Sequence, residues 1–194
     1  MSILVLTSDT LIGTPATGNI EYNGQFFGTD SNASRAQLQR IVRATAVAST
    51  SGTSIDFTGL PAWVKRVTVM FSGVSTSGSN NILIQLGAGS VDSASYNSAS
   101  ARTGPAAIST TGFTTGFGIN STNAANVIGG AVLIANLTSN TWVANGVLAD
   151  QAQANTYTIG GNKSLSGTLD RIRITTSGGT DTFDAGSINI LYEG

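Results

Sequence analysis

The sequence contains no cysteine and no histidine. Without cysteine, the chain cannot form disulfides, bind zinc through thiolates or use a thiol nucleophile. Without histidine, it lacks the most common general base near neutral pH and the most common metal ligand. Catalytic triads and dyads built on either residue are therefore excluded.

Carboxylates remain available for chemistry, because a glycosidase needs only two of them at a fixed separation. The ten acidic residues are scattered, and no pair stands in a recognisable catalytic context. Asp181 and Asp184 lie in the Gly-rich stretch TSGGTDTFDAGS, which is either a calcium-binding loop or a solvated turn before the last strand. We favour the turn, and we expect no enzyme activity, no cofactor and no metal.

Charge is also scarce. Charged residues make up 10% of the chain and the net charge is −1, whereas an average soluble protein has about 25% charged residues. No long-range field therefore favours nucleic acid or an anionic membrane. No apolar run approaches the roughly 20 residues of a membrane-spanning helix, and the opening MSILVL lacks the basic region of a secretion signal. We expect neither nucleic acid nor membrane as a partner.

The residues that are abundant favour β-structure. Hydrophobic residues reach 40%, glycine occurs 24 times, and serine with threonine makes up about a quarter of the chain, a composition that suits sheets and turns better than helices. Short β-prone runs separated by Gly-rich turns predict an antiparallel two-sheet sandwich over residues 43–194. Its strands are expected near 43–49, 54–58, 64–73, 80–88, 111–118, 129–137, 141–149, 154–160, 168–176 and 185–193.

Alternation within these runs predicts which side chains face the core. The expected core includes Val67, Val69, Phe71, Ile82, Ile84, Leu133, Leu137, Ile172, Ile174, Ile188 and Ile190. Arg171 and Arg173 are expected on the opposite face. The Ser/Ala/Gly-rich segment 89–110 is expected to be a long surface loop, in which Tyr96 and Asn97 offer either a sugar contact or mere spacing.

The two tryptophans are expected in the core rather than at a ligand. Trp63 precedes Lys65 and Arg66, a grouping that can stack bases or sugars. Tryptophan is, however, usually largely buried. We therefore expect Trp63 to cap the core, with Lys65 and Arg66 at the exposed strand edge, and we expect Trp142 to be buried.

Residues 1–42 differ from the rest and are predicted to form an N-terminal arm. Asn23-Gly24 between two β-prone runs is a strong hairpin signal. Residues 34–42 have the best helical propensity in the chain and are expected to form a short helix or turn. Because an isolated hairpin is only marginally stable, its aromatic side chains are expected to pack on a partner or, alternatively, on the chain's own sandwich.

A resemblance emerges from several blocks taken in order. The stretch SIDFTGLPAWVKRVTVMFSGVSTSGSNNILIQLG resembles a module of tailed-bacteriophage structural proteins, and later blocks continue the likeness in TWVANG, LSGTLDRIRITT and FDAGSINILYE. The stretch GTPATGNIEYNGQFFGTD is similar to a segment that precedes such modules. The resemblance implies an all-β, jelly-roll-like domain on a virion, made in the host cytoplasm, and leaves its position on the virion open.

Two positions on the virion, the head and the tail, are compatible with the resemblance. A short arm before one sandwich, with no heptad or collagen-like shaft, favours a capsid decoration (cement) protein that binds the head lattice. The alternative is a small tail-fibre or tail-tip protein in host adsorption, for which glycan binding is an open option. The expected partners are two further copies in a homotrimer and the major capsid protein or another virion protein. The expected assembly contacts are Ile3, Val5, Tyr22, Phe26, Phe27, Arg35 and Arg40.

Overall fold

The computed structural model describes residues 14, 16–23, 25–32 and 34–194. The chain divides into two units, Met1–Arg40 and Ile41–Gly194. All regular elements in the described residues are strands. No helix in this part of the chain is long and apolar enough to cross a membrane.

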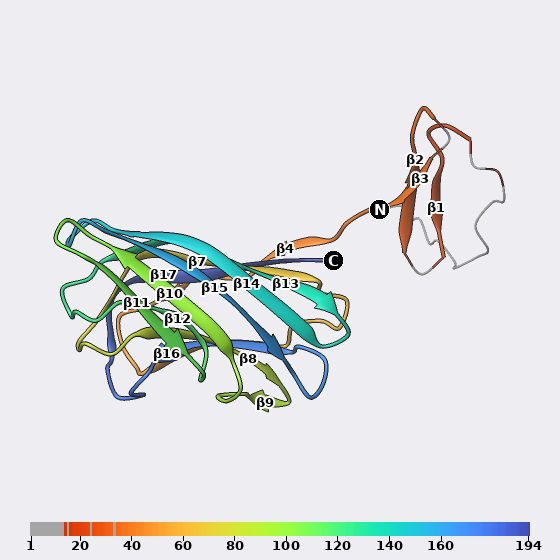
Figure 1. Cartoon of the computed structure of the whole chain (residues 1–194). Coiled ribbons are helices and arrows are strands. Elements are labelled where there is room, and N and C mark those ends of the chain that lie inside the picture. Colours follow the sequence, from red (N-terminus) through yellow and green to blue (C-terminus); the bar gives the residue numbers. More distant parts are fainter. Residues whose placement is uncertain (1–13, 15, 24, 33) are drawn as a thin grey trace. The chain divides into compact units, whose positions relative to one another are not determined.

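The larger unit is built on two antiparallel sheets (Figure 1). In the larger sheet the strand order is β11-β10-β15-β14-β13-β7-β17-β4, and β5 also pairs with β17. Its strands are β4 (Ile41–Arg43), β5 (Val47–Ala48), β7 (Arg66–Thr76), β10 (Asn97–Thr103), β11 (Ile108–Phe113), β13 (Ile128–Thr138), β14 (Thr141–Asp150), β15 (Asn155–Ser164) and β17 (Phe183–Glu193).

The smaller sheet has the order β12-β8-β16-β6, with β9 paired to β8. Its strands are β6 (Ser54–Thr58), β8 (Ile82–Ala88), β9 (Ser90–Val91), β12 (Phe117–Ile119) and β16 (Arg171–Thr176). Apolar side chains from both sheets form one buried cluster. The predicted antiparallel two-sheet sandwich is therefore confirmed, whereas the jelly-roll winding stays a prediction.

Most of the predicted core is found in this cluster, because the inward positions of each strand alternate as expected. Nine of the eleven predicted residues are buried: Val67, Val69, Phe71, Ile82, Ile84, Ile172, Ile174, Ile188 and Ile190. Trp142 is buried as predicted, at 3% exposure. Trp63 is half-buried against the cluster, and its ring lies 5.7 Å from that of Tyr192.

The prediction was wrong for Leu137 and for Leu133. Leu137 is 65% exposed, and Leu133 pairs in register with Thr68 and Asn145 on the outward side of the sheet. The inward residues of β13 are instead Val132 and Ile134. In the run Val132-Leu133-Ile134 every position is apolar, so alternation alone cannot assign the faces.

The surface loop predicted over 89–110 is also wrong. Most of this segment forms strands, with β9 followed by β10 and the start of β11. The inward positions of β10 hold Ser98 and Ser100, which are 7% and 1% exposed, and the Ser100 hydroxyl accepts a hydrogen bond from the backbone N–H of Asn120. Because serine fills the inward positions, the strand lacks the apolar alternation by which strands are recognised.

The smaller unit contains a three-stranded antiparallel sheet, β1 (Ile20–Tyr22), β2 (Phe26–Thr29) and β3 (Arg35–Gln37). The predicted hairpin is confirmed, with Tyr22 opposite Phe26, and Gly24 itself lies outside the described residues. The short helix or turn expected over 34–42 is wrong, because Arg35–Gln37 forms β3 and β4 begins at Ile41. Side chain and backbone pairing override helical propensity there: the Asp30 carboxylate accepts the N–H groups of Asn32 and Ser34, which turns the chain back onto β2.

Candidate functional site

The predicted assembly contacts of the arm are only partly visible. Ile3 and Val5 lie outside the described residues. The Phe26 side chain is 44% exposed, and its ring centroid lies 5.0 Å from that of Tyr22. Tyr22 and Phe27 are half-buried. The structure thus brings Tyr22 and Phe26 together and leaves an aromatic surface on the hairpin.

The two arginines of the arm differ in setting. The Arg35 guanidinium forms an ion pair with Glu21, with Nε 2.8 Å from the carboxylate oxygen, and its Nη2 lies 3.2 Å from the other oxygen. Arg35 therefore ties β3 to β1 across the arm's own sheet, a stabilising role that the sequence did not indicate. Arg40 is exposed and is the last residue of the unit.

The arm exposes two apolar side chains that the sequence reasoning missed. Ile20 is 70% exposed and Leu38 is 51% exposed. Ile20 pairs in register with Gly28, and the backbone N–H of Leu38 donates to the carbonyl of Phe26. With Phe26 they give this small sheet an unusually apolar surface. Alternation in the run IEY places Ile20 on the same face as Tyr22, and this signal could have identified Ile20.

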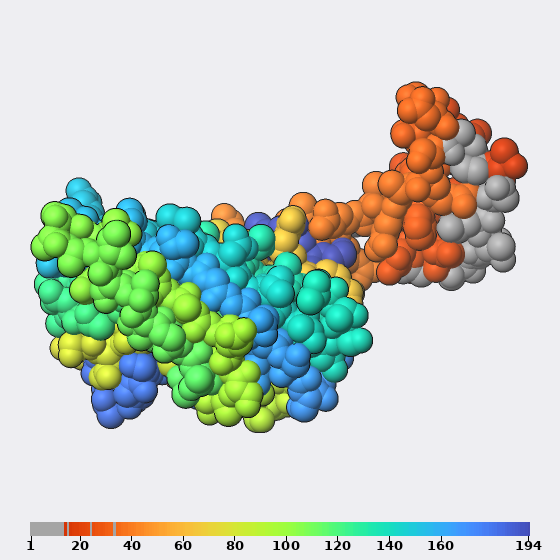
Figure 2. Space-filling model, viewed as in Figure 1, coloured from red at the N-terminus to blue at the C-terminus, as the bar shows by residue number. Residues whose placement is uncertain are grey.

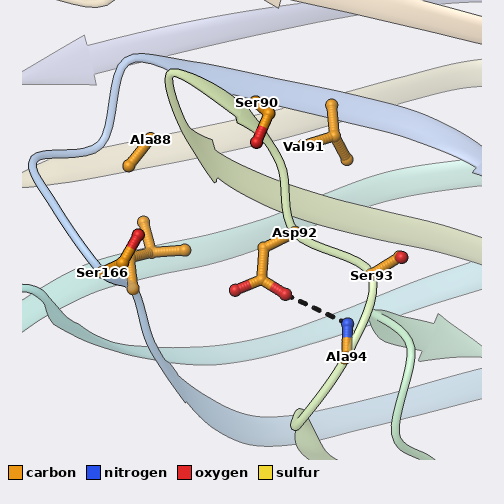
Figure 3. Close-up of a pocket in the computed structure, with 8 residues that line it drawn as sticks. Ala88, Ser90, Val91, Asp92, Ser93, Ala94 and Ser166 are labelled. Carbon is orange, nitrogen blue, oxygen red and sulfur yellow. Dashed lines mark hydrogen bonds between the residues drawn. The ribbon is translucent and has the colours of Figure 1, made fainter.

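A second candidate site is a pocket of about 300 Å³ in the sandwich. It is lined by Ala88, Ser90, Val91, Asp92, Ser93, Ala94, Leu165 and Ser166. Figure 3 shows the Asp92 carboxylate pointing into the space between Ser166 and Ala94, with a hydrogen bond of 3.1 Å from the Ala94 N–H. The pocket therefore presents one carboxylate among three serine hydroxyls.

Lys163 fixes the charge of this carboxylate. Its Nζ lies 2.7 Å from Asp92 Oδ2, and the Lys163 side chain is 4% exposed whereas that of Asp92 is 33% exposed. The same ammonium donates to the Ala94 carbonyl at 2.7 Å and lies 5.0 Å from the centroid of the Tyr96 ring. The hydrogen bond from Lys163 holds the pKa of Asp92 below its ordinary value, so the carboxylate is ionised at neutral pH.

Tyr96 is a support for the pocket and not an exposed sugar platform, which corrects the alternative raised from the sequence. It is 3% exposed. Its hydroxyl accepts a hydrogen bond of 2.7 Å from the Leu86 N–H and donates one of 3.0 Å to the Asp92 carbonyl. Burial raises the pKa of Tyr96, so this hydroxyl stays protonated and keeps the Asp92 segment on β8.

The sequence reasoning missed Asp92 and Lys163, although one signal was present. In β15 the inward positions are Tyr157 and Ile159, and the same alternation makes Lys163 inward as well. A lysine at an inward strand position needs a partner. Within the segment 89–110, Asp92 is the acidic residue that can pair with Lys163.

The other polar groups singled out from the sequence make local contacts. The Asp181 carboxylate accepts from the backbone N–H and side-chain amide of Asn80 at 2.8 and 2.9 Å, and Asp184 accepts from the Ser75 hydroxyl. Arg66 forms an ion pair with Glu193, and Lys65 is exposed. Among the described residues no group of three or more acidic, histidine or cysteine side chains is placed to hold a metal ion.

Comparison with protein families, curated proteins and solved structures finds no match to this chain. An ionised carboxylate with serine hydroxyls can bind a hydroxyl-rich ligand by accepting and donating hydrogen bonds. The exposed apolar side chains of the arm suit a contact with another protein surface.

Proposed function

We propose that the chain is a non-enzymatic structural protein of a tailed-bacteriophage virion, a capsid decoration protein that binds and stabilises the head lattice. It acts as a homo-oligomer whose arms bind the major capsid protein or another virion protein. The resemblance of its ordered blocks to phage structural modules supports the virion role. The observation that carries the proposal is the arm, a separate three-stranded unit with apolar side chains exposed on it.

The energetics of the arm favour a partner. A sheet of three short strands has little apolar area to bury by itself. Ile20, Phe26 and Leu38 are between 44% and 70% exposed, and burying apolar surface contributes about 25 cal/mol per Å². A protein lattice that covers these three side chains supplies that free energy and orders the arm at the same time.

We expect deletion of residues 1–40 to abolish binding to capsids while the sandwich keeps its melting temperature. The cut belongs after Arg40, because Ile41, Val42 and Arg43 pair with β17 in the sandwich. Co-sedimentation with capsids stripped of the protein measures binding, and calorimetry measures the melting temperature.

Full-length protein with Phe26→Ser is the companion variant, since it removes one exposed aromatic and leaves the sandwich intact. Its binding should weaken at least tenfold. Capsid binding by the truncated chain at full affinity would refute the attachment role, and so would aggregation or much earlier melting of the truncated chain.

The Asp92 pocket favours a second candidate function, that of a small tail-fibre or tail-tip protein that binds a host glycan. The pocket of about 300 Å³ has room for about one sugar ring. The Asp92 carboxylate would accept hydrogen bonds from neighbouring sugar hydroxyls, and Ser90 and Ser166 offer both donors and acceptors. No bond is broken in this function.

Under this second function we expect Ser166→Trp, which places a large side chain at the pocket, to reduce saccharide binding at least tenfold. Ser164→Trp is the matched control, because Ser164 is an exposed residue of β15 that does not line the pocket. A screen of bacterial surface polysaccharides against the immobilised full-length protein measures binding. No binding by the wild type, or equal losses in the two variants, would eliminate the glycan function.

A further inference from the structure

One outward face of the larger sheet carries no charged side chain over five adjacent strands. These strands, in order, are β11, β10, β15, β14 and β13. A row of residues in register runs across them and consists of Thr110, Ala101, Thr158, Val147 and Ala131. The neighbouring rows contain only alanine, glycine, threonine, serine, asparagine, valine, leucine and isoleucine. We call this surface the neutral face.

The neutral face is exposed in the sandwich unit, and Figure 2 shows it as a broad surface of teal, blue and green atoms over β13, β14, β15, β10 and β11. Val147 is 65% exposed at its centre, and Ile108 and Leu137 are 73% and 65% exposed towards its margins. These three side chains are separated by small and neutral polar residues, so the feature that marks the face is its lack of charge, which is typical of the core of a protein interface.

The outward face of the smaller sheet is different. There Arg173 forms an ion pair with Asp56 at 2.7 Å, and Arg171 forms one with Asp170 at 2.8 Å. On the larger sheet, charge begins only beyond β13, at β7, where the exposed Arg66 lies in register beside Ala135 and pairs with Glu193 of β17. The charge-free area therefore covers the five strands from β11 to β13 and ends there.

The size of the neutral face matches a stable interface between proteins. At about 4.8 Å between strands and about 3.4 Å per residue, strands of these lengths cover a flat area of roughly 700 Å². A standard interface buries about 800 Å² on each partner. A partner that covers this face must itself be free of charge, because an unpaired charge buried against it would be costly.

The same face on a second copy of the chain meets both requirements. It is uncharged, equally flat and of equal area, and its threonine and asparagine side chains can hydrogen-bond to one another across the contact. We propose that the neutral face pairs with the same face of a second copy of this chain across a two-fold axis. This inference rests on the proposed assembly function and identifies which surface joins the subunits.

Matched Thr→Lys variants of the full-length chain test this assignment. Thr158→Lys places a charge on β15 at the centre of the neutral face, and Thr58→Lys places the same charge on the exposed side of β6 in the smaller sheet. Light scattering coupled to size exclusion should show an oligomer for the wild type and for Thr58→Lys, and a monomer for Thr158→Lys.

Because the chain has no cysteine, single-cysteine variants give a second readout that does not depend on a disruptive charge. The thiol of Val147→Cys should react with a maleimide at least tenfold more slowly in concentrated protein than after dilution. The thiol of Thr58→Cys should react at the same rate in both. Concentration-dependent protection at Val147 alone supports the proposal.

A monomeric wild type at high concentration would overturn the inference, as would an oligomeric Thr158→Lys variant or equal reactivity of the Val147→Cys thiol at both concentrations. Capsid binding, measured separately on each variant, reports on the proposed function. Loss of capsid binding by the arm deletion with persistent oligomers supports both. Oligomers that never bind virions would leave the neutral face as the subunit contact and remove the decoration role.

Discussion

Replacing Phe117 with alanine should lower the free energy of unfolding of the sandwich by about 4 kcal/mol. The side chain is fully buried, at 0% exposure, and its ring meets that of Tyr96 edge-on, with centroids 5.2 Å apart. Phe117 belongs to β12, a three-residue strand that pairs with β8 opposite Ile84. Because so short a strand adds few backbone hydrogen bonds, packing of the Phe117 ring contributes much of the free energy that keeps β12 on the smaller sheet.

The matched control is Phe26→Ala in the arm, where the side chain is 44% exposed. It should leave the melting of the sandwich unchanged, because Phe26 belongs to the other unit. For a domain of this size, 4 kcal/mol corresponds to a fall of roughly 10 °C in melting temperature. Calorimetry on the two variants gives the comparison. A loss below about 1 kcal/mol for Phe117→Ala would mean that the core collapses around the cavity.

The sandwich was predictable from the sequence wherever its strands alternate cleanly. In β7, Val67, Val69 and Phe71 alternate with polar or flexible residues, so both the strand and its buried face were right. In β16, Ile172 and Ile174 alternate with two arginines and give the same result. The buried face of such a strand can be assigned from its own sequence, because one face is apolar and the other is polar.

Prediction failed where the inward positions are not distinctively apolar. β10 turns Ser98 and Ser100 inward, and β13 is apolar on both faces around Leu133. In each case the information that selects the face lies in neighbouring strands and not in the strand itself. The same applies to the neutral face, which appears only when five strands from separate parts of the sequence are placed side by side.

The Asp92 pocket was hidden for a related reason. Asp92 and Lys163 are 71 positions apart in the sequence, and only the pairing of β10 with β15 brings their segments together. Neither residue has a motif around it. The sequence does place Lys163 at an inward strand position, where a buried ammonium needs a counter-ion. Only the fold shows that Asp92 supplies it.

We expect Asp92→Asn to destabilise the sandwich by about 2 kcal/mol at pH 7, because it leaves the Lys163 ammonium without its counter-ion. Lys163 is 4% exposed, and its remaining contacts are the Ala94 carbonyl and the Tyr96 ring. Breaking a fully buried ion pair costs about 3–5 kcal/mol. The expected loss is smaller here because Asp92 is 33% exposed, so water screens part of the interaction.

The effect should depend on pH in one direction. The hydrogen bond from Lys163 lowers the pKa of Asp92 in the folded protein, so the ion pair stabilises the fold fully above the ordinary aspartate pKa of about 3.9. That stabilisation is lost as the pH falls through the lower, folded value. Urea unfolding at pH 7, and at steps below about pH 4, should therefore show wild type and Asp92→Asn converging in acid.

Asp56→Asn is the control for this series, since it removes the partner of Arg173 from a pair whose side chains are 37% and 36% exposed. An exposed pair contributes at most about 1 kcal/mol, so this variant should stay close to the wild type at pH 7. If Asp56→Asn and Asp92→Asn lose equal stability, burial of Lys163 does not govern the pair. If the Asp92→Asn deficit persists unchanged in acid, the ionised carboxylate is not its source, and the packing of the pocket segment against Tyr96 must be.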